Sequence, residues 1–272
     1  MEQALKTKQE EFFIPPIVKE LLSPVKKRVL TKDRDFVMVV DGEEGAGKSV
    51  LAQQLAKYFD PTFNLNRIVF TSDDFLRIIK DPRTKKGQAV VLDEAFSAAN
   101  SRASLTEVNR AMIGVATEMR QKNLFVILCI PSFFDLDKYF ALWRCRTLVH
   151  VYFTPEEHRR YIIFPKDHKK LLYLTGKKLY SYKKPYSPYP PFSFPHHYVV
   201  DETEYRLKKA NAFKKRTVSN QARKWLGQRD AYLRYISDTL SVAQDDIAKI
   251  PSNYGAVTLS VRQVRRVIGK VE

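Results

Sequence analysis

Short apolar runs alternate with amphipathic segments over roughly the first 155 residues. Runs rich in β-branched and aromatic residues predict buried strands at 36–41, 67–70, 89–94, 123–130 and 147–153. Segments with helical apolar spacing lie between them, at 48–59, 72–80, 105–122 and 134–143. This alternation predicts an α/β fold, a mostly parallel sheet covered by helices on both faces. Ligands bind such sheets at the carboxyl ends of the strands.

The pattern changes after residue 154. Apolar runs at 161–164 and 171–174 predict a hairpin added to the sheet edge, and the Pro-, Tyr- and Lys-rich stretch 176–198 predicts an extended surface loop. A charged helix is expected at 202–216. The regions we expect are an N-terminal arm at 1–34, a nucleotide-binding α/β domain at 35–175, a loop with a linker helix at 176–219 and a small all-α domain at 220–272.

A glycine-rich segment joins the first predicted strand to the first predicted helix. It reads GEEGAGKS and matches the phosphate-loop pattern G-x-x-x-x-G-K-[ST], with the flanking elements that the pattern requires. Its amides and the helix N-terminus attract phosphate, its lysine reaches the β- and γ-phosphates, and its serine hydroxyl binds Mg²⁺. We predict ATP, or a close purine nucleotide, and Mg²⁺ as ligands, contacted by Gly42, Glu43, Glu44, Gly45, Ala46, Gly47, Lys48, Ser49 and Val50.

Two adjacent acids, Asp93 and Glu94, close the third predicted strand. A carboxylate at this place holds Mg²⁺, and a second one just beyond it orients the attacking water. We therefore predict Asp93 as a metal residue and Glu94 as a catalytic residue. Two helix-capping acids would be the structural alternative.

These motifs resemble the additional-strand class of P-loop ATPases, and within it the FtsK/HerA-like translocases and related ATPases of viruses and mobile elements. The similarity covers about residues 36–153 and includes Asp93-Glu94-Ala95, Ser101-Arg102, Asn109, Arg120-Gln121-Lys122-Asn123, Pro131, Asp135 and Arg144. The family usually places a Gln after the fourth strand as a γ-phosphate sensor, whereas this chain has Ser132 there. Ser132 is the expected, weaker, nucleotide contact.

Several arginines are candidates for a finger that reaches the γ-phosphate of a neighbouring subunit. The candidates are Arg102, Arg120, Arg144 and Arg146, of which Arg120 and Arg144 are favoured as catalytic residues; a solvated or salt-bridged arginine is the alternative for each. A finger acting between subunits implies a homo-oligomer.

Positive charge is concentrated in the second part of the chain. The net charge is +17; residues 1–155 carry 23 Lys and Arg against 19 Asp and Glu, and residues 156–272 carry 24 against 11. A polyanion is the natural partner of such a surface, and we predict nucleic acid, most simply DNA.

The last region adds a second indication of DNA. Helices expected at 229–240, 244–250 and 258–268 resemble a helix-turn-helix module, although the connection 250–257 is longer than a tight turn. By that resemblance DNA would be contacted by Ser260, Arg262, Gln263, Arg265, Arg266 and Lys270. A three-helix cap with a solvated, arginine-rich face is the alternative.

Composition narrows the remaining choices. The 44% hydrophobic content excludes global disorder, no apolar run approaches the roughly 18 residues of a membrane span, and the charged N-terminus lacks a signal core. Two cysteines give no disulfide framework, so a cytoplasmic location is expected.

The leading prediction is an ATPase that acts on DNA in a virus, plasmid or mobile element. The alternatives are an ATP-dependent DNA-binding regulator or partition-type switch, and a kinase of a small molecule or nucleic-acid end.

Overall fold

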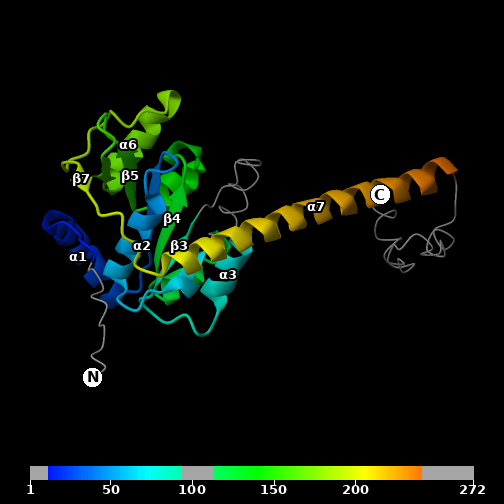
Figure 1. Ribbon diagram of the computed structural model, residues 1–272, viewed down its shortest axis with the longest axis horizontal. Coiled ribbons are helices and arrows are strands. Elements are labelled where there is room, and N and C mark those ends of the chain that lie inside the picture. Colours follow the sequence, from blue (N-terminus) through cyan, green and yellow to red (C-terminus); the bar gives the residue numbers. More distant parts are fainter. Residues whose placement is uncertain (1–11, 94–112, 241–272) are drawn as a thin grey trace, which may run out of the picture. The chain divides into compact units, whose positions relative to one another are not determined.

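A seven-stranded sheet forms the centre of the described part of the chain. The computed structural model describes residues 12–93 and 113–240. The strand order is β2-β3-β4-β1-β5-β6-β7, and Figure 1 labels β3, β4, β5 and β7 of this sheet. The strands are β1 (Phe36–Gly42), β2 (Ile68–Val69), β3 (Ala89–Leu92), β4 (Phe125–Ile130), β5 (Thr147–Phe153), β6 (Arg159–Phe164) and β7 (Phe192–Ser193). Strands β1 to β5 pair in parallel, and β6 and β7 extend the sheet antiparallel. The predicted α/β class is confirmed.

Helices connect and cover these strands. The α-helices of the described residues are α1 (Pro16–Thr31), α2 (Lys48–Phe59), α3 (Ser72–Lys80), α5 (Ala116–Gln121), α6 (Lys166–Gly176) and α7 (Glu202–Leu240). Short 3-10 turns are η1 (Leu65–Arg67), η3 (Phe133–Asp135) and η5 (Lys177–Leu179), and η4 (Phe140–Arg144) is a π-helical turn. Thr71 caps α3 because its hydroxyl accepts the amide of Asp74.

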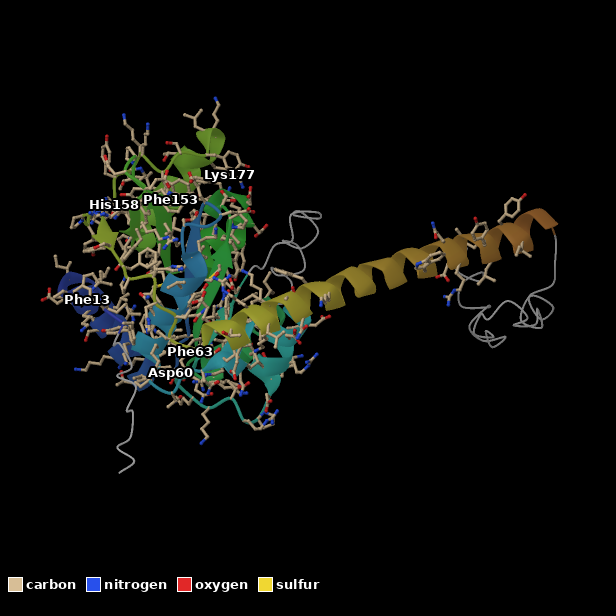
Figure 2. All side chains as sticks on the ribbon, in the orientation of Figure 1. Phe13, Asp60, Phe63, Phe153, His158 and Lys177 are labelled. Carbon is tan, nitrogen blue, oxygen red and sulfur yellow. The ribbon has the colours of Figure 1, made fainter. Side chains whose placement is uncertain are left out.

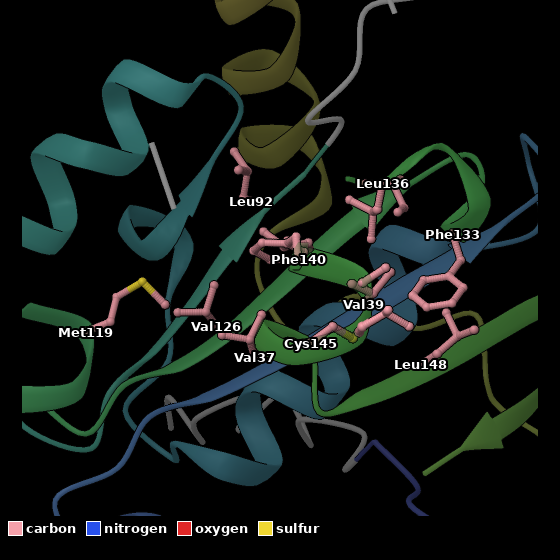
Figure 3. Packing of buried hydrophobic residues seen from close by; sticks show 14 of the residues in the cluster. Val37, Val39, Leu92, Met119, Val126, Phe133, Leu136, Phe140, Cys145 and Leu148 are labelled. Carbon is pink, nitrogen blue, oxygen red and sulfur yellow. The ribbon is translucent and has the colours of Figure 1, made fainter. Parts of the chain in front are cut away.

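The alternation of side chains along the strands creates two apolar layers. On one face, Val37 and Val39 of β1 belong to a buried cluster that includes Phe75 of α3, Met119 of α5 and Phe140 (Figure 3). On the other face, aromatic rings join the sheet to α2. The rings of Phe59 and Phe125 stack with centroids 4.5 Å apart, and Phe36 lies 5.5 Å from Phe59. Helices therefore cover both faces of the sheet, as the sequence predicts.

Strand register brings the chemically important ends of the strands to one edge of the sheet. Asp41 is level with Ile130 of β4 and with His150 of β5. Strand β4 lies between β1 and β3, and Leu92 is level with Leu128. The phosphate loop, which follows β1, and Asp93, which follows β3, therefore leave the sheet on the same side.

Helix α1 lies within the region predicted as an arm. It begins with Pro16, whose fixed φ and missing N–H suit the first helical position. The ammonium of Lys26 donates to the carbonyl of Tyr58 at 2.7 Å, and the Tyr58 hydroxyl donates to the carbonyl of Lys19 at 3.2 Å. These bonds join α1 to the end of α2.

The structure corrects several expected elements. The hairpin predicted at 161–164 and 171–174 is wrong, because β6 pairs with β5 and the second run lies in α6. Pro165 precedes this helix and Asp167 lies in its first turn, where a helix N-terminus favours negative charge. The helix predicted at 134–143 is instead η3 and η4. The predicted surface loop 176–198 contributes β7, in which Phe192 is buried.

Contacts divide the chain into two compact units, Met1–Lys209 and Ala210–Glu272. The helices expected at 202–216 and 229–240 form one continuous helix, α7, and the division falls within it. Described side chains of the second unit include the exposed Trp225 and Tyr232 and an ion pair between Arg229 and Asp230. Among the described residues, no helix combines the length and apolarity that crossing a membrane requires.

Candidate functional site

The phosphate loop connects the end of β1 to the start of α2. Gly42 has φ +136°, and a Cβ built on it would lie 1.9 Å from the carbonyl oxygen of Val151, so a side chain is excluded there. Gly47 has φ +96° and immediately precedes α2. Only glycine adopts these conformations at low cost. The loop therefore presents backbone and the amino end of α2, the arrangement that binds anions.

Lys48 is held over the beginning of this loop. Its Nζ donates to the carbonyl oxygen of Gly42 at 2.8 Å and to that of Glu43 at 2.6 Å. Burial lowers the pKa of Lys48, while the negative charges of Asp41, Glu44 and Asp93 act in the opposite direction. A phosphate oxygen beside the ammonium would stabilise its charged form.

Ser49 and Asp93 meet across the carboxyl ends of β1 and β3. The Ser49 hydroxyl donates to Oδ1 of Asp93 at 2.9 Å, and Asp93 is buried, with 1% exposure. The Asp93 amide donates to the carbonyl of Val69 at 2.8 Å, which fixes its backbone to β2. A hydroxyl and a carboxylate are hard oxygen ligands, and Mg²⁺ binds such groups together with nucleotide phosphates. The residues present therefore fit Mg²⁺.

The start of α7 adds side chains to Asp93 that the sequence analysis missed. Tyr205 is 2% exposed, and its hydroxyl donates to Oδ2 of Asp93. Burial raises the pKa of Tyr205, and the charge of Asp93 raises it further. Nζ of Lys209 lies 4.0 Å from Oδ2 of Asp93. Lys208 donates to the carbonyls of Leu65 and Ile68 at 2.8 and 2.7 Å, which fastens this turn to the sheet edge.

A second buried carboxylate, Asp41, lies at the end of β1. Its Oδ2 accepts the Phe133 amide at 2.7 Å and the Tyr182 hydroxyl, and Nδ1 of His150 lies 2.9 Å from its Oδ1. The rings of His150 and Tyr182 stack with centroids 3.6 Å apart. The sequence analysis missed this cluster. In the sequence, the only indication of this cluster was the position of Asp41 directly before the phosphate loop.

The segment after β7 crosses α2 beside the loop. Nε2 of the buried Gln54 donates to the carbonyls of Pro195 and His197 at 2.8 and 2.9 Å. A Cβ built on Gly47 would lie 3.1 Å from Cζ of Phe194 and 3.5 Å from Cδ of Arg159. Part of the predicted surface loop thus forms a wall of the phosphate-loop region.

Some of the remaining predicted site residues lie in the described part of the chain, and the others lie outside it. Ser132 caps the start of η3, and its hydroxyl accepts the Phe134 amide at 3.3 Å. Arg144 pairs with Asp35 at 2.6 Å, at the amino end of β1 and away from the phosphate loop, while Arg120 is exposed near the end of α5. Outside the described residues lie Glu94, Arg102, Ser260, Arg262, Gln263, Arg265, Arg266 and Lys270.

The strand order, the glycine-rich loop and the acid after β3 together define a P-loop type of α/β domain. Comparison with protein-family models gives no match, and no curated protein matches the chain. Among solved structures, the N-terminal domain of zonular occludens toxin from Neisseria meningitidis is similar to this chain. The two share 16% sequence identity over 49% of this chain and 85% of that domain, with a TM-score of 0.33.

Proposed function

We propose that this chain binds ATP with Mg²⁺ through Gly42–Ser49, hydrolyses it, and acts on or with DNA. The observation that carries the nucleotide part is the Ser49–Asp93 contact of 2.9 Å beside a loop that begins and ends with positive-φ glycines. The sequence motif and the geometry converge there, because the two residues that the motif assigns to Mg²⁺ lie together although 44 positions separate them.

Each residue of the site has a role in this proposal. The amides of the loop and the start of α2 bind the phosphates, and Lys48 neutralises the negative charge on the β- and γ-phosphates. Ser49 and Asp93 hold Mg²⁺, which supplies positive charge to the phosphate oxygens when bound. Glu94, the next residue after Asp93, orients a water molecule and accepts its proton at the carboxylate.

The resemblance to additional-strand ATPases agrees with the position of β4 between β1 and β3. The DNA part is supported by charge, because most of the excess of Lys and Arg lies after residue 155. The helix-turn-helix prediction for 220–272 concerns residues that lie mostly outside the described part of the chain. Translocation, packaging or assembly in a mobile element is the work proposed for hydrolysis, by a homo-oligomer in which an arginine of one subunit reaches the next.

Phosphate release from ATP, measured with and without single- or double-stranded DNA, tests the proposal. We expect Mg²⁺-dependent release that DNA stimulates. Glu94→Gln should still bind ATP but release little phosphate. Absence of stimulation by either form of DNA would exclude a motor, and normal hydrolysis by the variant would remove Glu94 from its role.

A DNA-binding switch with slow turnover is the second candidate. It is favoured by Ser132, which occupies the place of the expected Gln and whose hydroxyl accepts the Phe134 amide. A deletion of residues 220–272 distinguishes the candidates. Loss of sequence-specific DNA binding with unchanged ATP hydrolysis supports the switch, and loss of DNA-stimulated hydrolysis supports the motor.

A further inference from the structure

An open cavity of about 700 Å³ lies beside the phosphate loop. It is lined by the end of β5, the β5–β6 turn, the start of β6, and the end of β7 with the segment that follows. Figure 2 labels two of its residues, Phe153 and His158. Its volume is within the range of small-molecule sites, about 300–1,000 Å³. We call it the hairpin cavity.

The hairpin cavity and the phosphate loop share a wall. Phe194 and Arg159 line the cavity, and both lie against Gly47, as the contacts of a Cβ built on that glycine show. Gly47 directly precedes α2, where the loop would hold phosphates. A nucleotide bound by this loop therefore has its remaining part, the ribose and base, within reach of the cavity.

The walls provide flat groups that suit an aromatic base. The guanidinium carbon of Arg159 lies 5.9 Å from the centroid of the Phe153 ring, and Phe194 contributes a second aromatic ring. Guanidinium and aromatic planes both stack on nucleobases.

Arginine and histidine side chains outnumber carboxylates in the walls. Arg159, Arg160, His158 and His196 line the cavity, and Glu157 is the one carboxylate among its described lining residues. Burial and the charge of Arg159 lower the pKa of His196, which favours the neutral form of this imidazole. The surroundings fit an acceptor-rich, uncharged ring joined to phosphates, rather than a cationic ligand.

We propose that the hairpin cavity binds the purine nucleoside part of the nucleotide, with Arg159 and Phe153 contacting the base. This inference rests on the proposed function, because the phosphates are those held by Gly42–Ser49. It makes Arg159 and Phe153 the residues that distinguish a nucleoside triphosphate from inorganic tripolyphosphate, which has the same phosphates and no base.

Calorimetric titration of the full chain with ADP and with inorganic tripolyphosphate, both with Mg²⁺, tests this inference. Arg159→Lys, which keeps the positive charge but loses the planar guanidinium, and Phe153→Leu should each weaken ADP binding about tenfold, which corresponds to loss of one stacking contact. Binding of tripolyphosphate should stay within about twofold of the unmodified chain. Arg77→Ala, on the exposed side of α3, is the matched control and should change neither affinity.

The outcomes separate the inference from the proposed function. Unchanged ADP affinity in both cavity variants overturns the inference and leaves the proposed function standing. A parallel loss for ADP and tripolyphosphate also overturns it, because the cavity would then act on phosphates. Failure of the unmodified chain to bind either ligand overturns the proposed function as well.

Photolabelling with 8-azido-ATP gives a second measurement that does not depend on variants. We expect the modified peptides to contain residues 153–160 or 193–196. Labelling that is competed by ATP but confined to other peptides would place the base elsewhere and overturn the inference.

Discussion

Asp41 and Asp93 are two buried carboxylates at the same edge of the sheet, and they have different partners. Each follows the apolar part of a strand, and each accepts a tyrosine hydroxyl, from Tyr182 and Tyr205 respectively. The other partners of Asp41 are the Phe133 amide and His150. Those of Asp93 are the hydroxyl of Ser49 and, at 4.0 Å, the ammonium of Lys209.

The two sets of partners suit different roles. Asp41 binds a backbone amide and two rings that stack on each other, so its bonds hold the ends of β1, β4 and β5 together. Asp93 binds a hydroxyl of the phosphate loop, and both groups suit Mg²⁺. We therefore propose that Asp41 contributes to stability and that Asp93 belongs to the nucleotide site. Tyr205 extends the second set of contacts into α7, the helix that continues into the second unit.

The largest expected effect is that of Asp93→Asn on turnover. Loss of the metal-binding carboxylate should lower Mg²⁺-dependent phosphate release about a thousandfold, because metal binding contributes several kcal/mol to such reactions. Steady-state phosphate release measures this effect, with circular dichroism as the check on folding. Turnover within tenfold of the unmodified chain would break the assignment of Asp93.

Asp41→Ala should act on stability instead. The change leaves the Phe133 amide, the Tyr182 hydroxyl and His150 without their acceptor, at a cost of about 3 kcal/mol in the free energy of unfolding if each contributes about 1 kcal/mol. Urea unfolding measures the loss. A variant as stable as the unmodified chain would contradict the structural assignment of Asp41.

The two tyrosines provide a matched pair of smaller changes. Tyr205→Phe removes a hydroxyl that orients Asp93, and the loss of such a partner lowers metal affinity about tenfold. Tyr182→Phe removes the equivalent hydroxyl from Asp41 and should leave Mg²⁺ affinity unchanged. Titration of Mg²⁺ against ADP binding measures both. Equal effects of the two changes would remove the distinction between the carboxylates.

The smallest expected effect concerns Lys48, which both carboxylates influence. Its pKa is lowered by burial, so a fraction of the folded chain loses this proton at a pH below the ordinary value of 10.5. Bound phosphates favour the charged form, so ADP binding at alkaline pH should take up a fraction of a proton, and this fraction should grow as pH rises toward the lowered pKa of Lys48. Calorimetry in buffers of different ionisation enthalpy measures the uptake. Proton release at this pH would contradict the account.

Local pattern was enough to predict that a strand and a helix flank the glycine-rich loop and that Asp93 follows a strand, because each motif depends on residues that are close in sequence. The partners of the two carboxylates could not be predicted in the same way. Tyr182 is 141 positions from Asp41, and Tyr205 is 112 positions from Asp93. Nothing in the Tyr-rich loop or the charged helix distinguishes these tyrosines from their neighbours.

The fold shows the same limit at the antiparallel end of the sheet. The run at 171–174 is too short to distinguish a strand from one face of a helix by periodicity. In the structure this run lies in α6, where Leu172 and Tyr173 are buried and Leu171 and Leu174 are exposed. Two of the four residues in the run are therefore buried, but the run forms part of a helix and not the predicted strand.

The most direct test of the central claim is phosphate release from ATP by the full chain with Mg²⁺, compared with Lys48→Ala. Lys48 contacts only loop carbonyls among its described hydrogen bonds, so its removal tests the nucleotide site with little disturbance of the core. The account predicts Mg²⁺-dependent release by the unmodified chain and its loss in the variant. No release above the buffer rate, or equal release by the variant, would contradict it.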